Sequence, residues 1–288
     1  GTGDGSSWAN ASADLQAMID TAATGDEIWV AMGTYYPTES FSNGSTIFSD
    51  KTFHYNDNVD IKIYGGFAGT ETSITQRIVG NISILSGDIG IPNDNSDNSF
   101  HVVLTQNLTN ASLLDNFTIQ GGNADSTGAS GTNLDRNQGG GMANYQSEIV
   151  ISNCVFKDNT SIFQGGAMRN NSNANVTVLN CVFTNNSSSN PSAGAGSGGA
   201  VYNFASGGQY INTVFHNNTA KVAGGATAYS ASGAGSSPNF INCNFINNTS
   251  PCIISFTNEA KSCSGTHPNL FFALEGSPIN KSTSVGRK

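Results

Sequence analysis

A short motif of alternating polar and apolar positions recurs through the second half of the chain. Each copy reads Asn, Cys or Thr, any residue, Phe, two further residues and Asn, and a Gly-Gly-Ala segment follows three of the copies. The copies occupy residues 153–159 with 165–170, 180–186 with 198–203, 212–218 with 224–227, and 242–248, and a looser copy lies at 114–122 with 139–142. Such repetition indicates a fold built by stacking one unit on the next.

The spacing of the motif predicts the shape of the unit. The Cys or Thr position returns roughly every thirty residues, which suits one coil of a parallel β-helix with short strands and glycine-rich corners. A propeller blade needs about forty residues, and a leucine-rich repeat needs leucine ladders that this sequence lacks. We therefore predict an all-β protein, a single-stranded parallel β-helix or solenoid.

Stacking the copies in register predicts columns of like side chains. The last Asn of each motif should point inward and hydrogen-bond to the neighbouring coil, while the first Asn forms a second column. The Phe position should form an interior aromatic stack, with Phe117 as its first member, and the Gly-Gly corners should allow positive φ and close approach of neighbouring coils. The predicted ladders are Asn159, Asn186, Asn218 and Asn248; Asn153, Asn180, Asn212 and Asn242; and Phe156, Phe183, Phe215 and Phe245.

The N-terminal region has a different pattern. Residues 12–20 have a Ser cap and apolar residues at helical spacing, residues 27–32 read as a strand, and 33–35 read as its turn. We expect this short helix to cover the open end of the stacked sheets, the alternative being an ordinary surface helix. Further strands are predicted at 61–64, 82–85 and 101–104, with a loop or hairpin at 41–57.

These elements divide the chain into four parts. Residues 1–36 form an N-terminal cap, 37–112 form early coils with long loops, 113–250 form regular coils, and 251–288 form a C-terminal strand and tail.

The composition fits this fold and narrows the partners. Charged residues are 11% of the chain, against about a quarter in a typical soluble domain, and there are 34 Gly. The net charge of −9, without any run of Lys or Arg, disfavours nucleic acid, anionic membrane surfaces and polyanionic glycans as partners. No stretch approaches the roughly 18 apolar residues of a membrane span. Because the chain starts at Gly1 without a signal-peptide pattern, we expect a processed or trimmed protein.

Five cysteines fall into two groups. Cys154, Cys181 and Cys243 share one repeat column with Thr213, where a free thiol serves as a small buried apolar group. A Cys154–Cys181 bridge is the alternative, because neighbouring coils lie about 4.8 Å apart. Cys252 and Cys263 lie outside the column and could close a disulfide loop in an oxidising compartment. The sequence contains neither a Cys-x-x-Cys motif nor a Cys/His cluster, so it does not indicate a metal site of this kind.

The motifs resemble those of a known group of proteins. The repeats carried by 156–159 with 165–168 and by 183–186 with 198–201 resemble those of polymorphic outer-membrane protein passengers. Secreted right-handed β-helix repeat proteins of environmental bacteria, notably Bacteroidetes, are similar at residues 1–9, 25–31 and 63–72. The resemblance reaches to about residue 248 and implies a right-handed parallel β-helix at the cell surface or in the medium, with adhesion as the usual role. No membrane-anchoring barrel or secretion domain follows, so we expect that one was removed or that the chain is a fragment.

The repeats are poor in groups that could do chemistry. Between residues 139 and 250 the charged residues do not align into the carboxylate pair that a glycoside hydrolase needs, so we assign no catalytic residue. Tyrosines expected on the surface could stack on sugar rings beside a cation, with plain packing as the alternative. The binding candidates are Arg169, Tyr202, Tyr210 and Tyr229, together with Tyr145.

The loop at residues 88–97 offers enough oxygen ligands for one Ca²⁺, through Asp88, Asp94 and Asp97, although its spacing is also that of a solvated turn. No other cofactor is required by the sequence.

We therefore predict an extracellular or cell-surface structural or adhesive protein. It would bind glycans or other surfaces, or assemble with itself into a layer or filament, without a membrane span. The alternative is a polysaccharide lyase or glycoside hydrolase whose site lies in the loops at 88–101 and 125–136.

Overall fold

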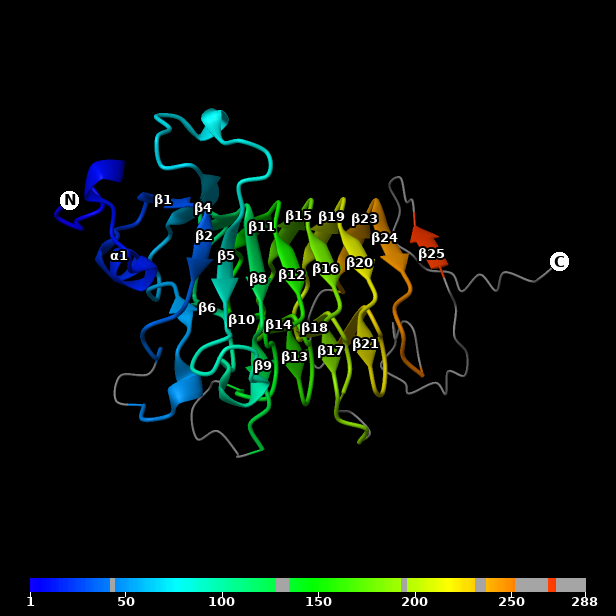
Figure 1. The fold of residues 1–288 in the computed structure, drawn as a ribbon. Coiled ribbons are helices and arrows are strands. Elements are labelled where there is room, and N and C mark those ends of the chain that lie inside the picture. The colour runs from blue at the N-terminus through cyan, green and yellow to red at the C-terminus, as the bar shows by residue number, and fades with distance from the viewer. Residues whose placement is uncertain (42–44, 128–134, 193–195, 231–236, 252–268, 273–288) are drawn as a thin grey trace.

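The protein is an all-β stack of mostly parallel strands. The structure is a computed structural model that describes residues 1–41, 45–127, 135–192, 196–230, 237–251 and 269–272. Within these residues the strands form four sheets that run side by side along one axis, with α1 (Leu15–Thr21) at the N-terminal end (Figure 1). This arrangement confirms the prediction of an all-β protein with stacked parallel strands, as in a β-helix or solenoid. The described residues contain no helix long and apolar enough to cross a membrane.

Each regular coil contributes one strand to each sheet, and we name the sheets A to D in the order in which a coil visits them. Sheet A holds β1 (Glu27–Ala31), β4 (Lys62–Phe67), β7 (Leu113–Asp115), β11 (Val150–Ser152), β15 (Thr177–Leu179), β19 (Gln209–Ile211) and β23 (Asn239–Ile241). Sheet B holds β2 (Gly33–Tyr35), β5 (Ser83–Ser86), β8 (Phe117–Gln120), β12 (Val155–Lys157), β16 (Val182–Thr184), β20 (Val214–His216), β24 (Cys243–Ile246) and β25 (Asn269–Phe272).

The other two sheets complete the coil. Sheet C holds β9 (Asn123–Ala124), β13 (Thr160–Ser161), β17 (Ser187–Ser188) and β21 (Thr219–Ala220). Sheet D holds β3 (Phe53–His54), β6 (Val103–Gln106), β10 (Met142–Tyr145), β14 (Met168–Asn171), β18 (Val201–Phe204) and β22 (Thr227–Ser230). In the described part of the chain, four single-turn 3₁₀ helices lie outside the sheets: η1 (Trp8–Asn10), η2 (Phe48–Asp50), η3 (Ile74–Gln76) and η4 (Asn95–Asp97).

Glycine pairs before sheet D let neighbouring coils approach closely. Gly165 has a φ of +64°, a conformation that side chains with a Cβ rarely adopt. A Cβ on Gly166 would lie 2.4 Å from the carbonyl oxygen of Gly199 in the next coil. The repeated Gly-Gly pair therefore serves both purposes expected from the sequence, a left-handed turn and a close backbone contact.

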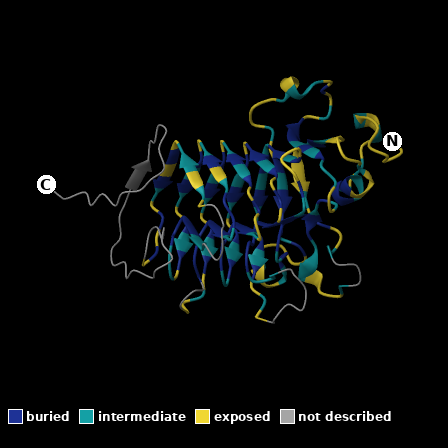
Figure 2. Ribbon diagram, turned by 180° about the vertical axis from the view of Figure 1, so that it is seen from behind, coloured by how far each residue is buried: buried dark blue, intermediate teal, exposed yellow. Residues whose placement is uncertain are grey.

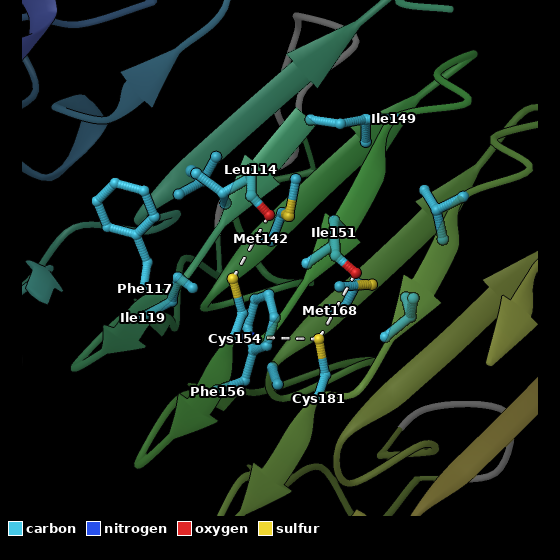
Figure 3. Packing of buried hydrophobic residues seen from close by; sticks show 14 of the residues in the cluster. Leu114, Phe117, Ile119, Met142, Ile149, Ile151, Cys154, Phe156, Met168 and Cys181 are labelled. Atoms are coloured by element: carbon cyan, nitrogen blue, oxygen red, sulfur yellow. Dashed lines mark hydrogen bonds between the residues drawn. The ribbon is translucent and has the colours of Figure 1, made fainter. Parts of the chain in front are cut away.

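Flat aromatic stacking fills the core of the regular coils. The rings of Phe156, Phe183, Phe215 and Phe245 stack with centroid separations of 4.7, 5.0 and 4.9 Å, which confirms the predicted column. Phe117 does not belong to it, because β8 pairs with β12 in a register that places Ile119 opposite Phe156. Phe117 is buried two positions earlier and faces Ser83 of the preceding coil. Figure 3 shows Phe156 packed among the aliphatic and sulfur-containing side chains of this core.

The cysteine column is interior and reduced. Cys154, Cys181 and Cys243 are buried, free thiols, and Thr213 occupies the same buried column. The backbone N–H of Cys154 donates to the Cys181 sulfur at 3.4 Å (Figure 3), and burial raises the pKa of the Cys154 thiol well above its usual value. These thiols pack as small apolar groups, and the alternative of a Cys154–Cys181 bridge is not formed.

The buried Asn ladder forms as predicted. Asn159, Asn186 and Asn218 are fully buried, and Asn248 is 7% exposed. The Asn186 Oδ1 atom accepts from both the backbone N–H and the side-chain amide of Asn159, each at 3.1 Å. The Asn186 Nδ2 atom donates to the Phe156 carbonyl and to Asn218 Oδ1, each at 3.0 Å. The Asn186 amide therefore joins its own coil to the coils on both sides and satisfies polar groups that burial would otherwise leave unpaired.

A further buried ladder, not predicted from the sequence, runs through sheet D. Asn144 Nδ2 donates to Asn170 Oδ1 and Asn170 Nδ2 donates to Asn203 Oδ1, both at 2.8 Å, and all three residues are fully buried. Thr105 begins the ladder by donating to Asn144 Oδ1 at 2.6 Å. Its sequence signal is the Asn that follows the Gly-Gly pairs of three coils, at a position where alternation along the strand points it to the inner face; in the next coil this position holds Tyr229.

The N-terminal helix covers the end of the stack. Leu15 and Ile19 join the core, and the carboxylate of Asp14, rather than the predicted Ser12, accepts the N–H groups that cap the helix. The fully buried Gln16 amide donates to the His54 carbonyl at 3.0 Å and accepts from the His54 N–H at 2.9 Å. His54 lies on β3, the first strand of sheet D, so Gln16 takes the place of a further strand at this edge.

The predicted turn at residues 33–35 is wrong, because these residues form β2, which pairs in parallel with β5. In the segment 41–57, predicted as a loop or hairpin, Lys51 forms an antiparallel bridge with Ser40, which precedes the segment, while Phe53 and His54 already belong to sheet D. At the other end of sheet B, β25 pairs antiparallel with β24.

The buried Asn ladder should dominate the stability of the regular coils. Asn186→Ala removes four hydrogen bonds and leaves buried partners unpaired at about 1–3 kcal/mol each, so we expect the free energy of unfolding to fall by about 3 kcal/mol or more. Asn180→Gly, in the exposed Asn column of the same coil, should cost less than about 1 kcal/mol because Gly accepts its φ of +54°. Urea unfolding of both variants checks the difference, and equal losses would contradict this role for the ladder.

Candidate functional site

The outer face of sheet B is a regular surface without strong charge. Alternate side chains of its strands point outward in two rows, most of them half-exposed and Asn244 exposed. Lys157 carries the one formal charge among the ten described positions of these rows. The rows are Thr118, Val155, Val182, Val214 and Asn244, and Gln120, Lys157, Thr184, His216 and Ile246.

Two columns of exposed Asn and Asp border this face. At the corner between sheets A and B, side-chain amides of successive coils donate to one another at 3.4, 3.2 and 2.7 Å. Figure 2 shows exposed residues gathered at the corners while the strands between them are largely buried or half-buried. The columns are Asn153, Asn180, Asn212 and Asn242 between sheets A and B, and Asp158, Asn185, Asn217 and Asn247 between sheets B and C.

Backbone conformation explains why these corners carry Asn and Asp. All eight residues have φ between 51° and 57°, in the left-handed region that Asn and Asp tolerate better than other residues with a Cβ. The repeat sequence therefore places a hydrogen-bonding amide or carboxylate at both edges of sheet B in each of the four coils that contain β12, β16, β20 and β24.

Arg169 lies on the outward side of sheet D but is not exposed, so it is not a cation on an open surface as its choice as a binding candidate assumed. It is 4% exposed, donates from Nη1 to Gln164 Oε1 at 2.8 Å, and lies 4.7 Å above the Tyr202 ring. Its Nε has no partner within the described part of the chain. Burial lowers the pKa of Arg169 to about 10.

One outward row of sheet D is covered, and Arg169 lies in it. The residues in this row are at most 8% exposed, so an outward direction in this row does not lead to solvent. That row contains Leu104, Ala143, Arg169, Tyr202 and Ala228.

The predicted tyrosines do not form an exposed aromatic surface. Tyr210 is fully buried and bonds through its hydroxyl to Asn170 and Asn203 of the unpredicted ladder, so it cannot stack on a ligand. Tyr145 and Tyr202 are 7% and 8% exposed. The expectation of exposed rings is therefore wrong for these three residues. Tyr229 is half-buried on β22, and a binding role for Arg169, Tyr202 or Tyr229 stays a prediction.

A pocket beside sheet D brings together residues from three distant segments. Asp50 and Arg136 form a bidentate ion pair with N–O distances of 2.6 and 2.7 Å. His101, from the segment leading into β6, is 5% exposed and lines the same pocket. Its lining is Phe41, Ser49, Asp50, Thr52, His101, Leu104 and Arg136. His101 and Arg136 lie at the ends of the two loops in which the sequence placed an alternative catalytic site, whereas Asp88 does not line the pocket.

The environment of His101 determines its protonation state. Its Nδ1 lies 3.0 Å from the Gly139 carbonyl oxygen, and burial lowers the pKa of the imidazole below its usual value. A neutral ring with a proton on Nδ1 fits this contact, because a carbonyl oxygen accepts only from an N–H. The lone pair then lies on Nε2, which has no partner among the described residues.

The acidic side chains of the 88–97 loop are bonded to their own loop. Asp88 accepts from the Asn93 N–H at 3.0 Å, Asp94 from the Ser96 N–H at 2.9 Å, and Asp97 from the Ile91 N–H at 2.8 Å. A search of the described residues finds no group of three or more His, Cys, Asp and Glu that could hold a metal ion. Binding of Ca²⁺ here stays a prediction, as does a disulfide between Cys252 and Cys263, which lie outside the described residues.

Asp50 and Gly139 are the partners that the sequence did not indicate. Asp50 lies 86 residues from Arg136, inside a segment predicted only as a polar loop or hairpin. No local spacing links it to Arg136, so only the stacking of the early coils places them together.

Comparison with protein-family models, with curated proteins and with solved structures found no match. The resemblance to bacterial β-helix repeat proteins therefore rests on the motifs of the chain itself.

Arg169 should be replaceable by an apolar side chain of similar length. Its cation is buried without a bonded carboxylate, so we expect Arg169→Met to change the free energy of unfolding by less than about 1 kcal/mol, or to raise it. Arg169→Ala should lower it by about 2 kcal/mol or more, because the packing on Tyr202 and Phe204 is lost. Denaturant unfolding of both variants tests this, and a large loss in Arg169→Met would mean that the charge itself stabilises the fold.

His101 should make the protein less stable in acid. Because its pKa is lowered in the fold from an ordinary value of 6.5, the unfolded chain takes up a proton first as the pH falls. Its contribution to stability is therefore complete above the unfolded pKa and declines as the pH drops through and below it. We expect the loss of stability between about pH 7 and about pH 5 to be smaller in His101→Gln than in the unmodified protein. His216→Gln, at a half-exposed position, controls for the loss of one histidine, and identical slopes in all three proteins would refute the assignment.

Proposed function

We propose that this chain is a right-handed parallel β-helix that acts outside the cell or at its surface as a structural or adhesive element. It binds glycans or another polymeric surface through the outer face of sheet B, or assembles with further copies of itself. The observation that carries this proposal is the regularity of that face, where four successive coils repeat outward positions, half-exposed except at Asn244, between two exposed columns of Asn and Asp.

The chemistry of the face supports binding by shape and hydrogen bonds. Its rows combine aliphatic side chains with Thr, Gln, Asn and His, and the bordering columns offer both donors and acceptors. Neighbouring strands lie about 4.8 Å apart, so an outward position of each row returns at that interval along the stack. An extended polymer could engage many such weak contacts at once, which gains affinity by multivalency.

The rigidity of the scaffold supports the same function. Buried Asn ladders join consecutive coils, and their side chains are already ordered before any ligand arrives. A preorganised surface loses little conformational entropy on binding. This favours a role in which the molecule presents a fixed surface over one in which it closes around a substrate.

A binding assay with paired surface variants tests the proposal. Thr184→Glu with His216→Glu places two charges in one row of sheet B on neighbouring coils, and Thr177→Glu with Gln209→Glu places the same charges in one row of sheet A. We expect cosedimentation with insoluble polysaccharides or bacterial cell walls to fall at least about tenfold for the sheet B variant, which corresponds to about 1.4 kcal/mol, and to persist for the sheet A variant.

Assays on the unmodified protein can refute the proposal directly. If it binds no glycan on an array, no cell wall and no whole cells, and also sediments as a monomer at high concentration, the structural or adhesive role is refuted. Equal loss of binding in both double variants would place the contact elsewhere on the stack.

A further inference from the structure

The pocket beside sheet D, lined as described above, combines polar groups of opposite character. The Asp50 carboxylate is held by the Nε and Nη2 atoms of Arg136 and also accepts from the Ser45 hydroxyl. The paired charges largely cancel, so neither an anion nor a cation is strongly attracted. A bound anion would meet the Asp50 carboxylate, and a cation would meet the Arg136 guanidinium.

The feature that calls for a ligand is His101. His101 is only 5% exposed, and its Nε2 atom has no hydrogen-bond partner in the described part of the chain. A buried polar atom without a partner costs about 1–3 kcal/mol, which a suitable donor would recover. Because Nδ1 carries the proton donated to the Gly139 carbonyl, Nε2 can only accept.

The remaining wall narrows the chemistry of that donor. Phe41 and Leu104 supply apolar surface, while Ser49 and Thr52 supply hydroxyl groups. Phe41 is half-buried, with its ring in edge contact with the ring of His54 at a centroid distance of 5.3 Å. A ligand here needs one neutral group that both donates and accepts, next to an apolar face that can lie against an aromatic ring.

We propose that this pocket binds a hydroxyl group of a neutral carbohydrate. The hydroxyl donates its proton to His101 Nε2 and accepts from the Arg136 guanidinium, and the apolar face of the sugar ring packs on Phe41. This inference takes its ligand class from the proposed glycan-binding function. It concerns a separate surface, because the pocket residues lie beside sheet D and not on sheet B.

Nitrogen-15 NMR of the His101 side chain tests the site directly. The full chain labelled at its histidines is titrated with methyl glycosides of glucose, galactose, mannose and N-acetylglucosamine, and with glycerol as a minimal diol. We expect at least one glycoside to shift the His101 Nε2 resonance as this atom gains a hydrogen bond, while the His54 and His216 signals stay in place. Glycerol should produce a weaker shift, because it has no ring to pack on Phe41.

Two variants separate the site from a general effect. His101→Phe removes the acceptor, and Phe41→Ala removes the ring contact while keeping His101 for observation; both should weaken glycoside binding at least about tenfold. The sheet B variant Thr184→Glu with His216→Glu should bind the same glycoside as well as the unmodified protein. If this variant loses polysaccharide binding but still binds the glycoside in the pocket, the two surfaces act separately.

Three results would overturn the proposal. They are no shift of His101 Nε2 with any glycoside, a proton found on Nε2 in the free protein, or glycoside binding unchanged in His101→Phe. If His101→Phe does not fold, Phe41→Ala decides the question through the same titration.

Discussion

In-register stacking of neighbouring coils is the constraint on which the rest of this structure depends. A coil buries backbone and side-chain polar groups between its neighbours, where water cannot satisfy them, so each group must find its partner one coil away. Asn159, Asn186, Asn218 and Asn248 solve this problem with the same side chain at every level. The Phe stack can form only because the same register repeats, since a shift of one residue would turn each ring to the opposite face.

The same constraint restricts where recognition can occur. Inward positions are occupied by ladders and core side chains, and corners must adopt left-handed or glycine conformations. Variation is left to the outward rows of the sheets and to the segments between them. Sheet B presents regularly spaced aliphatic and polar side chains between two columns of exposed Asn and Asp. Around sheet D, the early coils instead bring Asp50, His101 and Arg136 into one pocket.

The repeats allowed the regular part of the fold to be predicted closely, and the exceptions have local causes. The exposed and buried Asn columns, the interior thiols and the Phe stack follow from aligning the copies. The prediction that Phe117 belongs to the Phe stack was wrong, because the looser copy shifts the alignment by two residues, so that Ile119 faces Phe156. The ladder through Asn144, Asn170 and Asn203 was not predicted, although strand alternation after the glycine pairs points these amides inward.

The sequence alone determined the repeating unit, its strands, its left-handed corners and the partners that face one another between coils, because all of these depend on interactions that recur at one fixed spacing. Only the tertiary structure decided which outward residues reach solvent. Arg169, Tyr202 and Tyr210 look like surface groups in the repeat but are buried, two of them in the covered outward row of sheet D and the third inside the core. It also decided that Asp50 meets Arg136 across 86 residues. Burial and long-range pairing depend on how irregular segments fold over the stack, and no periodicity in the chain encodes that.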